Sequence, residues 1–263
     1  MDLGLKGKSV LVTGGNRGIG LAIALAFADE GANVVVCGRD KAALAEAEAK
    51  LKAKGVKAKA VAVDLFTAQG CIDAVQAAVN THGGLDVLVN NASTAVSGNI
   101  ETLDDEGLME RLTGKTLAYM RCCRAALPHL RKSARGRVIC IGGSAVRHAA
   151  ATALPSALGN SAITAFTKQF SSTVAAQGIT VNVVHPPFTK TDRFPARRAA
   201  RAKQLGVSEA EAEASFAKQF PIGRIVEPSD IAPMITFLAS PHASAITGQS
   251  IAIDGGSTPG IFY

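Results

Sequence analysis

The chain has 263 residues, of which 48% are hydrophobic and 19% are charged. These proportions are typical of a globular protein with one sizeable core, and no apolar run reaches the roughly 18 residues that a membrane span needs. The net charge of +7 accompanies ten Phe, two Tyr and no Trp, without a basic stripe interleaved with stacking side chains, which argues against nucleic-acid binding.

Short β-branched runs alternate with helical patterns from one end of the chain to the other. The runs lie near 9–13, 33–37, 59–64, 85–90, 137–142, 179–184 and 249–254. Parallel strands need crossover helices, which are right-handed and cover both faces of the sheet. The pattern therefore predicts an α/β fold, a doubly wound Rossmann-type parallel sheet of seven strands. In such sheets ligands bind at the carboxyl ends of the strands.

The first strand leads into a glycine-rich turn. Thr13-Gly14-Gly15-Asn16-Arg17-Gly18-Ile19-Gly20 follows the apolar run Val10-Leu11-Val12 and opens a segment of helical apolar periodicity. Glycine permits a tight turn and close approach of a ligand, and the following helix points free N–H groups at an anion. We therefore predict that this turn binds the pyrophosphate of a dinucleotide, through Gly14, Asn16, Arg17, Gly18, Ile19 and Gly20.

We expect a single dinucleotide-binding domain that covers residues 1–263. One irregular insertion interrupts it at about 186–222. It begins with Pro186-Pro187, continues through an Arg- and Ala-rich helical stretch from Arg193 to Phe220, and closes with Pro221. Because it follows a strand on the ligand side, we predict a lid over the substrate. The arginines of this segment suit an anionic substrate, and they are Arg193, Arg197, Arg198 and Arg201. A purely structural helical excursion is the alternative.

The five cysteines and five histidines form no metal or disulfide pattern. The cysteine number is odd, no pair has CxxC spacing, and most lie in apolar runs, as buried reduced thiols do. No paired histidines or carboxylate cluster indicate a metal site. The first residues lack both a secretory and a transit pattern, so we expect a cytoplasmic protein.

From about Leu5 to Gly256 the chain resembles the short-chain dehydrogenase/reductase family. The glycine turn is similar to the family's phosphate loop, Asn90-Asn91-Ala92 to its Asn-Asn-Ala-Gly segment, and Asp254-Gly255-Gly256 to its terminal signature. Ser93 stands where that segment has glycine. The resemblance implies hydride transfer between a nicotinamide and a carbonyl or alcohol of a small-molecule substrate. It also implies a homodimer or homotetramer. The apolar end Ile261-Phe262-Tyr263 is expected to dock against a neighbouring subunit.

The resemblance also assigns roles to residues that follow the later strands. Asp64 and Leu65 would lie at the adenine ring, and Asn91 and Ala92 beside the cofactor. Ser144 would orient the substrate. Further residues would complete the nicotinamide pocket: Pro186, which shapes it, and Thr191, which binds the carboxamide.

The second strand favours NADP(H) over NAD(H). An NAD site places a carboxylate on the ribose at this strand end, whereas an NADP site supplies cations for the extra phosphate. Here the strand ends in Gly38-Arg39, and Arg17 lies in the glycine turn. Asp40 is expected to cap the next helix.

The family's catalytic pair, a Tyr and a Lys four residues later, is not matched. Alignment through Ala162 to Lys168 places Ser156 at the Tyr position and Asn160 at the Lys position. Lys115 falls where the family has an Asn that supports the lysine. Our hypothesis is that Lys115 supplies the lost cation while Asn160 still binds the ribose. A surface lysine, or one that only packs between helices, is the alternative.

Several groups are candidates for the lost proton donor. The Ser156 hydroxyl is short and weakly acidic, and a water held by Ser144 and Lys115 is a second candidate. His148 is a third candidate, because histidine is a common proton donor, but it is also typical of an exposed loop, and Tyr119 is expected to face the core. We therefore predict an NADP(H)-dependent oxidoreductase with altered proton-transfer residues. The alternative is a catalytically silent dinucleotide-binding sensor or partner subunit.

Overall fold

The computed structural model describes residues 1–260, so the predicted docking of Ile261, Phe262 and Tyr263 lies outside the described residues. The described chain forms a parallel sheet with the strand order β3-β2-β1-β4-β5-β6-β7. The strands are β1 (Ser9–Thr13), β2 (Asn33–Gly38), β3 (Ala58–Ala62), β4 (Val87–Asn90), β5 (Arg137–Ile141), β6 (Thr180–His185) and β7 (Ser250–Ala252). The seven-stranded doubly wound sheet that we predicted is confirmed.

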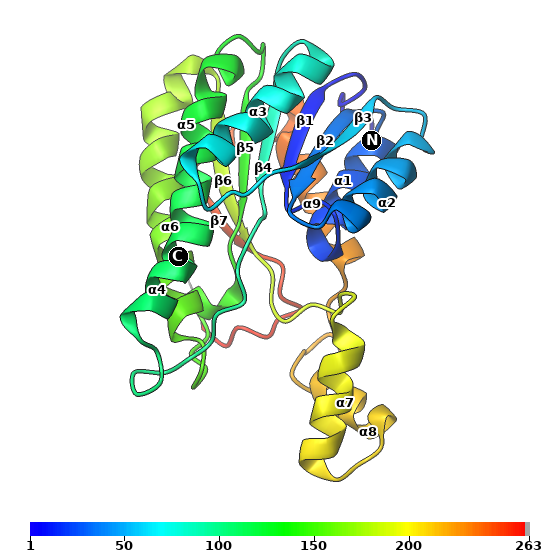
Figure 1. Cartoon of the computed structure of the whole chain (residues 1–263), viewed down its shortest axis with the longest axis vertical. Coiled ribbons are helices and arrows are strands. Elements are labelled where there is room, and N and C mark those ends of the chain that lie inside the picture. Colours follow the sequence, from blue (N-terminus) through cyan, green and yellow to red (C-terminus); the bar gives the residue numbers. More distant parts are fainter. Residues whose placement is uncertain (261–263) are drawn as a thin grey trace.

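Helices cover both faces of this sheet (Figure 1). One layer consists of α1 (Gly18–Asp29), α2 (Lys41–Lys52) and α9 (Pro228–Ala239). The other consists of α3 (Ala68–His82), α5 (Ala118–Leu130) and α6 (Leu154–Val174). The short helix α4 (Asp105–Arg111) precedes α5, and α7 (Phe194–Leu205) and α8 (Glu209–Ala217) follow β6.

The strand sequence explains the two-sided core. Alternate residues of a strand point to opposite faces, and in β1 the buried Val10 and Val12 pack with α1 and α9 while Leu11 packs with α3 and α5. A strand covered on both faces is apolar at successive positions rather than at every second one. This is why the predicted strands read as continuous Val and Ile runs.

Local capping signals fix the ends of several helices. The Asp40 carboxylate accepts a hydrogen bond from the Ala43 N–H at 3.1 Å, which confirms the predicted cap of α2. The helical stretch expected from Arg193 to Phe220 is two helices, because Gly206, with φ +66°, ends α7. Ser208 and Glu211 then form a capping box that starts α8.

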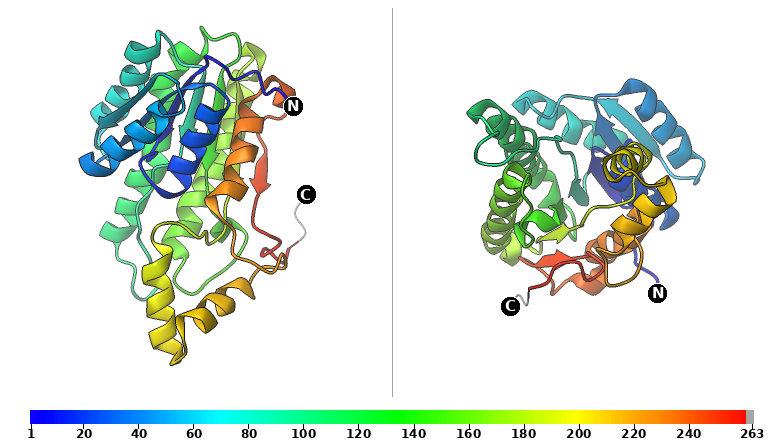
Figure 2. Two further views of the ribbon diagram at one scale, coloured as in Figure 1. Left: turned by 90° about the vertical axis from the view of Figure 1, so that its right-hand side faces the viewer. Right: turned by 90° about the horizontal axis from the view of Figure 1, so that it is seen from below.

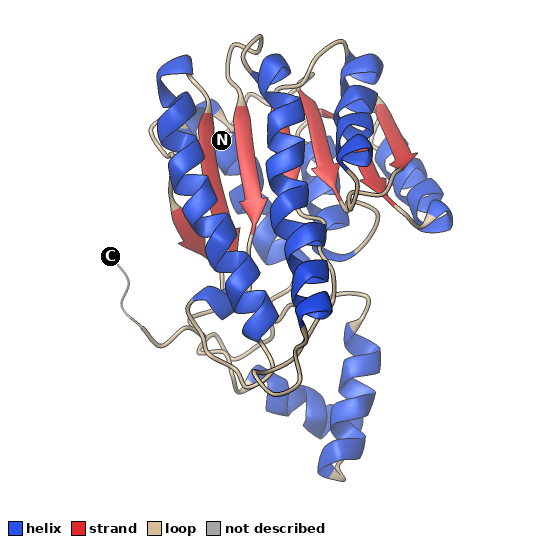
Figure 3. Ribbon diagram, turned by 60° about the vertical axis from the view of Figure 1, so that its left-hand side comes forward, coloured by secondary structure: helices blue, strands red, loops and turns tan. Residues whose placement is uncertain are grey.

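The helices α7 and α8 stand apart from the sheet at one end of the molecule (Figure 2). Figure 3 shows that the strand arrows point toward this end, so it is the carboxyl edge of the sheet. Ligands of doubly wound folds bind at this edge. The predicted lid segment is therefore on the ligand side of the sheet.

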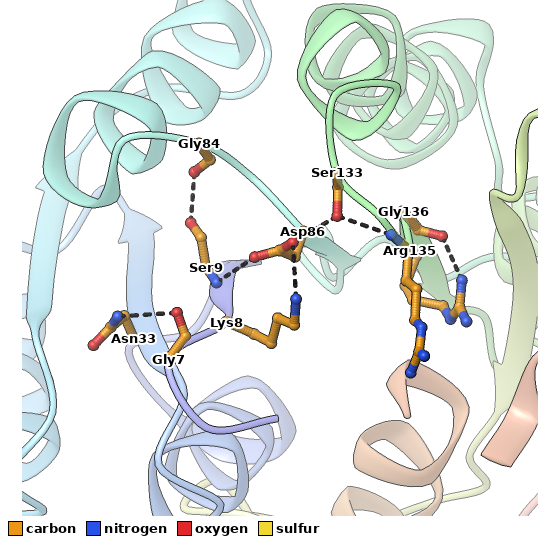
Figure 4. A network of polar contacts seen from close by, with 10 residues as sticks. Gly7, Lys8, Ser9, Asn33, Gly84, Asp86, Ser133, Arg135 and Gly136 are labelled. Atoms are coloured by element: carbon orange, nitrogen blue, oxygen red, sulfur yellow. Dashed lines mark hydrogen bonds and ion pairs between the residues drawn. The ribbon is translucent and has the colours of Figure 1, made fainter. Parts of the chain in front are cut away.

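A polar network ties the strands together at the opposite edge (Figure 4). The Asp86 carboxylate accepts hydrogen bonds from the Ser9 N–H at 2.9 Å and the Ser133 hydroxyl at 2.5 Å, and it pairs with Lys8 at 3.6 Å. Ser9 Oγ also donates to the Gly84 carbonyl at 2.6 Å. These contacts hold the segments that enter β1, β4 and β5. Across residues 1–260, no helix combines the length and apolarity needed to cross a bilayer.

Candidate active site

A pocket of about 1210 Å³ runs along the carboxyl edge of the sheet. It is lined from the turn after β1, across the ends of β2 to β6, to the segment that carries α7 and α8. All the predicted cofactor residues line it: Gly14, Asn16, Arg17, Gly18, Ile19, Gly20, Arg39, Asp64, Leu65, Asn91, Ala92, Asn160, Pro186 and Thr191. Residues far apart in sequence thus converge on one cavity.

The glycine turn forms a tight cradle at one end of this pocket. Gly14 has φ +63°, and a Cβ there would lie 2.9 Å from the Ala92 Cα. A Cβ on Gly20 would meet the Gly14 carbonyl and the Asn91 side chain. The Asn91 amide holds this arrangement, since it donates to the carbonyls of Thr13 and Gly14 at 3.0 and 3.1 Å.

The helix that follows the cradle keeps its first N–H groups available. Arg17 at the N-cap of α1 makes no side-chain capping bond, and the first turn contains no acidic residue. An uncapped helix N-terminus with a glycine cradle is suited to a pyrophosphate. The cradle therefore fits the predicted dinucleotide.

Two arginines flank the end of β2. Arg17 and Arg39 are both exposed and line the pocket, and the Arg39 guanidinium lies 5.7 Å from the centroid of the Phe66 ring. Asp40 is occupied as a helix cap. This part of the pocket thus offers two cations, while the carboxylate that follows Arg39, that of Asp40, caps α2.

Lys115 lies at the other end of the pocket, on a π-helical turn (Leu112–Leu117) between α4 and α5. Such turns are rare and are frequently found at functional sites. The Lys115 side chain is 3% exposed, and its Nζ donates a hydrogen bond to the Gly142 carbonyl at 2.8 Å. Burial, followed by the nearby Arg111 charge, holds the pKa of Lys115 well below its usual 10.5.

Ser156 and Asn160 both line the pocket and lie one turn apart on α6. Asn160 is buried, and its amide Nδ2 donates to the Gly143 carbonyl at 3.4 Å. Its Oδ1 is buried and has no partner within the described structure. Ser144, which begins the turn after β5, lines the same region.

Two other candidates for the proton donor lie elsewhere. Tyr119 is buried in the core as expected, donates to the Ile141 carbonyl at 3.0 Å, and has a pKa raised well above 10.0 by burial. His148 is exposed and is not among the residues that line the pocket. The structure therefore brings Lys115, Ser144, Ser156 and Asn160 together and leaves Tyr119 and His148 outside.

The lid arginines do not act as one group. Arg193 and Arg197 line the pocket, and Arg197 also lies 5.3 Å from the centroid of the Phe188 ring. Arg198 is instead paired with Glu209 at 2.6 Å and Glu213 at 3.1 Å, which ties α7 to α8. The expectation that the lid arginines face an anion is therefore wrong for Arg198, whose charge is used within the lid, and for Arg201, which donates to Gln204 and does not line this pocket.

Sequence reasoning missed three kinds of residue near the site. Arg111 lines the pocket although it is 5% exposed, and Phe188 and Phe216 line it from the lid segment. His185 lies behind the site, where its Nδ1 is 3.1 Å from the Gly143 backbone and burial lowers its pKa to about 4. The one available signal was the i, i+4 spacing of Arg111 and Lys115, which places both on one side of a helix.

The cysteines behave as structural thiols. All five are buried and free. Burial raises the pKa of Cys37 to about 12 and that of Cys140 to about 11, so these thiols stay protonated at neutral pH. Across residues 1–260, no group of three or more His, Cys, Asp or Glu side chains is arranged to hold a metal ion.

Comparisons with known proteins agree with this geometry. The family model described as enoyl-(acyl carrier protein) reductase matches residues 14–258. The chain is 30% identical to the 3-oxoacyl-[acyl-carrier-protein] reductase FabG of Chlamydia pneumoniae, over 98% of this chain and all of that protein. It is also 30% identical to the NADPH-dependent reductase BacG of Bacillus subtilis, over 97% of this chain and 99% of that one.

Solved structures show the same relationship. The L-sorbose reductase of Gluconobacter frateurii, in complex with NADPH and L-sorbose, superposes with a TM-score of 0.94 at 31% identity and covers 99% of this chain and 100% of its own. An actinorhodin polyketide ketoreductase variant with NADPH superposes with a TM-score of 0.89 at 31% identity, over 95% and 97% of the two chains. The sheet, the glycine cradle and these matches together establish that the chain belongs to the short-chain dehydrogenase/reductase family.

Proposed function

We propose that this chain is an NADP(H)-dependent oxidoreductase acting on a carbonyl or alcohol substrate, with altered proton-transfer residues. The observation that carries this proposal is the continuity of the pocket, which joins the glycine cradle at one end to Lys115, Ser144 and Ser156 at the other. The NADPH complexes and NADPH-dependent activities named for its relatives support the same cofactor.

The cofactor would be held along the strand ends. The cradle and the N-terminus of α1 take the pyrophosphate, and Arg17 and Arg39 take the additional phosphate. Asp64 and Leu65 flank the adenine, and Asn160, Pro186 and Thr191 surround the nicotinamide and its ribose. When bound, the nicotinamide supplies a hydride to a carbonyl or accepts one from an alcohol.

Lys115 performs the proton chemistry in this proposal. A buried lysine with a lowered pKa is a stronger acid than an exposed one, and the Gly142 carbonyl holds its Nζ at the pocket wall. The Lys115 ammonium releases its proton to the substrate oxygen, directly or through a water molecule that Ser144 holds. Ser144 also orients that oxygen by hydrogen bonding.

A catalytically silent dinucleotide-binding sensor or partner subunit remains the second candidate. The observation in its favour is the pair Ser156 and Asn160, neither of which is an effective acid at neutral pH. The Asn160 amide donates a hydrogen bond to the Gly143 carbonyl. This contact stabilises the structure and does not require catalysis.

Binding and turnover separate the two candidates. The purified protein is titrated with NADPH and with NADH by nucleotide fluorescence, and a panel of carbonyl substrates is then screened for loss of NADPH absorbance. We expect NADPH to bind more tightly than NADH and at least one carbonyl to be reduced. Tight NADPH binding without turnover on any carbonyl, or on any alcohol with NADP⁺, would select the silent protein.

Variants then test the assigned roles. Lys115→Ala should lower the rate by at least about 100-fold, the usual contribution of a proton-transfer group, and Ser156→Ala by less than about tenfold. Lys132→Ala, which removes an exposed lysine after α5, is the charge-matched control. Equal losses in the Lys115 and Ser156 variants would contradict the role of Lys115.

Three further expectations stay proposals. These are the lid role of the segment at about 186–222 within a single domain, assembly into a homodimer or homotetramer, and a cytoplasmic location. Sedimentation of the purified chain measures the second of them directly.

A further inference from the structure

Arg111 is a buried arginine in the wall of the substrate end of the pocket. It is the last residue of α4, is 5% exposed, and lines the cavity with Ser156 and Lys115. One terminal nitrogen donates to the Ser93 hydroxyl at 2.7 Å and to the Thr94 carbonyl. Its Nε is buried and has no hydrogen-bond partner within residues 1–260. The protein therefore satisfies this guanidinium only in part.

Within residues 1–260, the charge of Arg111 is also not balanced by an acidic side chain. None of the ion pairs within the described chain involves Arg111 or Lys115. The charged group that acts on Lys115 is Arg111 itself, four residues earlier, so two buried basic side chains stand together. Burial of an uncompensated charge is costly, and such groups are normally paired or bind a charged ligand.

Small residues on α6 leave room for this guanidinium. A Cβ built on Gly159 would lie 3.5 Å from the Arg111 Nε, so the arginine packs against α6 at that point. Ser156 is three residues earlier and lies on the same side of the helix. Arg111 thus stands beside the position where the proposed reaction takes place.

The residues around Arg111 differ from those that would hold the cofactor phosphates. The glycine cradle and α1 follow β1, whereas Arg111 lies between the segment after β4, through Ser93 and Thr94, and Gly159 of α6. A planar guanidinium matches a planar carboxylate with parallel hydrogen bonds. We propose that Arg111 binds a carboxylate of the substrate, so that this chain acts on a small oxo acid or the corresponding hydroxy acid. This inference rests on the proposed function.

Matched pairs of acids and esters test the proposal. Pyruvate, acetoacetate and levulinate, each against its methyl ester, are titrated by calorimetry into the protein with and without NADPH. Inorganic phosphate is titrated in parallel. For at least one pair we expect the acid to bind about tenfold or more tightly than the ester, a difference of about 1.4 kcal/mol, with phosphate weaker than that acid. If phosphate binds more tightly than every acid, the carboxylate assignment is wrong and Arg111 would bind a phosphate ester instead.

Arg111 variants separate charge from structure. Arg111→Gln keeps hydrogen-bond donors without the charge, and Arg111→Lys keeps the charge in another shape. We expect the acid preference to disappear in Arg111→Gln and to survive in part in Arg111→Lys. Arg131→Gln removes a charge from an exposed residue at the end of α5 and should leave the preference unchanged.

Different results would reject the carboxylate site at Arg111 and the proposed NADP(H)-dependent function. No acid preferred over its ester, or a preference that persists in Arg111→Gln, rejects the assignment of Arg111. Absence of NADPH binding in the same titrations counts against the proposed function instead. Unfolding curves of each variant in urea establish that a lost preference is not a lost fold.

Discussion

Lys115 and Gly142 are joined by a hydrogen bond of 2.8 Å from the lysine Nζ to the backbone carbonyl, which links the π-helical turn before α5 to the segment that follows β5. The lysine is 3% exposed and has Arg111 as its charged neighbour. This contact places a basic side chain with a lowered pKa in the wall of the pocket.

Carbonyl reduction should depend on the protonation of Lys115. The pKa of Lys115 is lowered, so the ammonium is present below that pKa and is lost as the pH rises through it, well before 10.5. The rate of NADPH oxidation should therefore fall on the alkaline side. In Lys115→Arg the rate should be low at every pH and this alkaline fall should be absent, because arginine keeps its proton and cannot donate it to the substrate. An alkaline limb that is identical in the variant would exclude Lys115 as the titrating group.

The free energy of unfolding should increase as the pH rises, whereas the rate of NADPH oxidation should decrease. Because the folded pKa lies below the unfolded one, the folded state binds fewer protons between them, and stability decreases as the pH falls through the folded pKa. Lys115→Met removes the buried charge and should gain about 1–4 kcal/mol over the parent protein at pH 6. Above about pH 11, where lysine is neutral in both states, the gain should vanish. Urea unfolding at both pH values measures the difference.

Coenzyme preference should depend on the cations near β2. Arg39→Ala should weaken NADPH binding by about tenfold or more, because a charge-assisted hydrogen bond to phosphate is worth about 1.5–3 kcal/mol. NADH, which lacks that phosphate, should be affected by less than about twofold. Fluorescence titration with both nucleotides measures the ratio. An equal loss for both would indicate that Arg39 acts through its stacking on Phe66 rather than through charge.

The glycine cradle should tolerate no side chain at Gly20. Its Cβ would meet the Gly14 carbonyl and the Asn91 amide, so Gly20→Ala forces the loop apart. We expect NADPH binding to fall by more than about tenfold and stability to fall by about 1–3 kcal/mol. Gly84→Ala is the matched control, because no atom lies within 4 Å of a Cβ there. Similar binding by both variants would contradict the role of the cradle.

The lid should act through its aromatic contacts. Phe188 and Phe216 stack with ring centroids 5.0 Å apart, and both line the pocket. Phe216→Ala should raise KM for the carbonyl substrate several-fold and leave the Kd for NADPH within about twofold, because Phe216 belongs to the lid segment and not to the glycine cradle. Leu205→Ala on the exposed side of α7 is the control. A change in NADPH affinity without one in KM would contradict the lid assignment.

Much of the fold and of the cofactor end could be predicted because the signals are local. Strand β1 and the following turn are continuous in sequence, and glycine spacing reports backbone geometry directly. The Asp40 cap was predictable for the same reason, since it depends on three neighbouring residues. The break between α7 and α8 was missed although Gly206 and Ser208 carry local stop and start signals, because the surrounding Arg and Ala residues all favour a helix.

The other end of the pocket was decided by packing between distant segments. Sequence could place Lys115 on a helix near the site, but its burial and its bond to Gly142 depend on how α5 approaches the end of β5. Arg111 gave no sequence signal of its own, because a basic residue at the end of a short helix is usually solvated. The sequence by itself determined the sheet, the cradle and the cations near β2, all of which depend on short-range geometry. Only the tertiary structure decided which basic side chains lose their water, because desolvation depends on neighbours brought together from different elements.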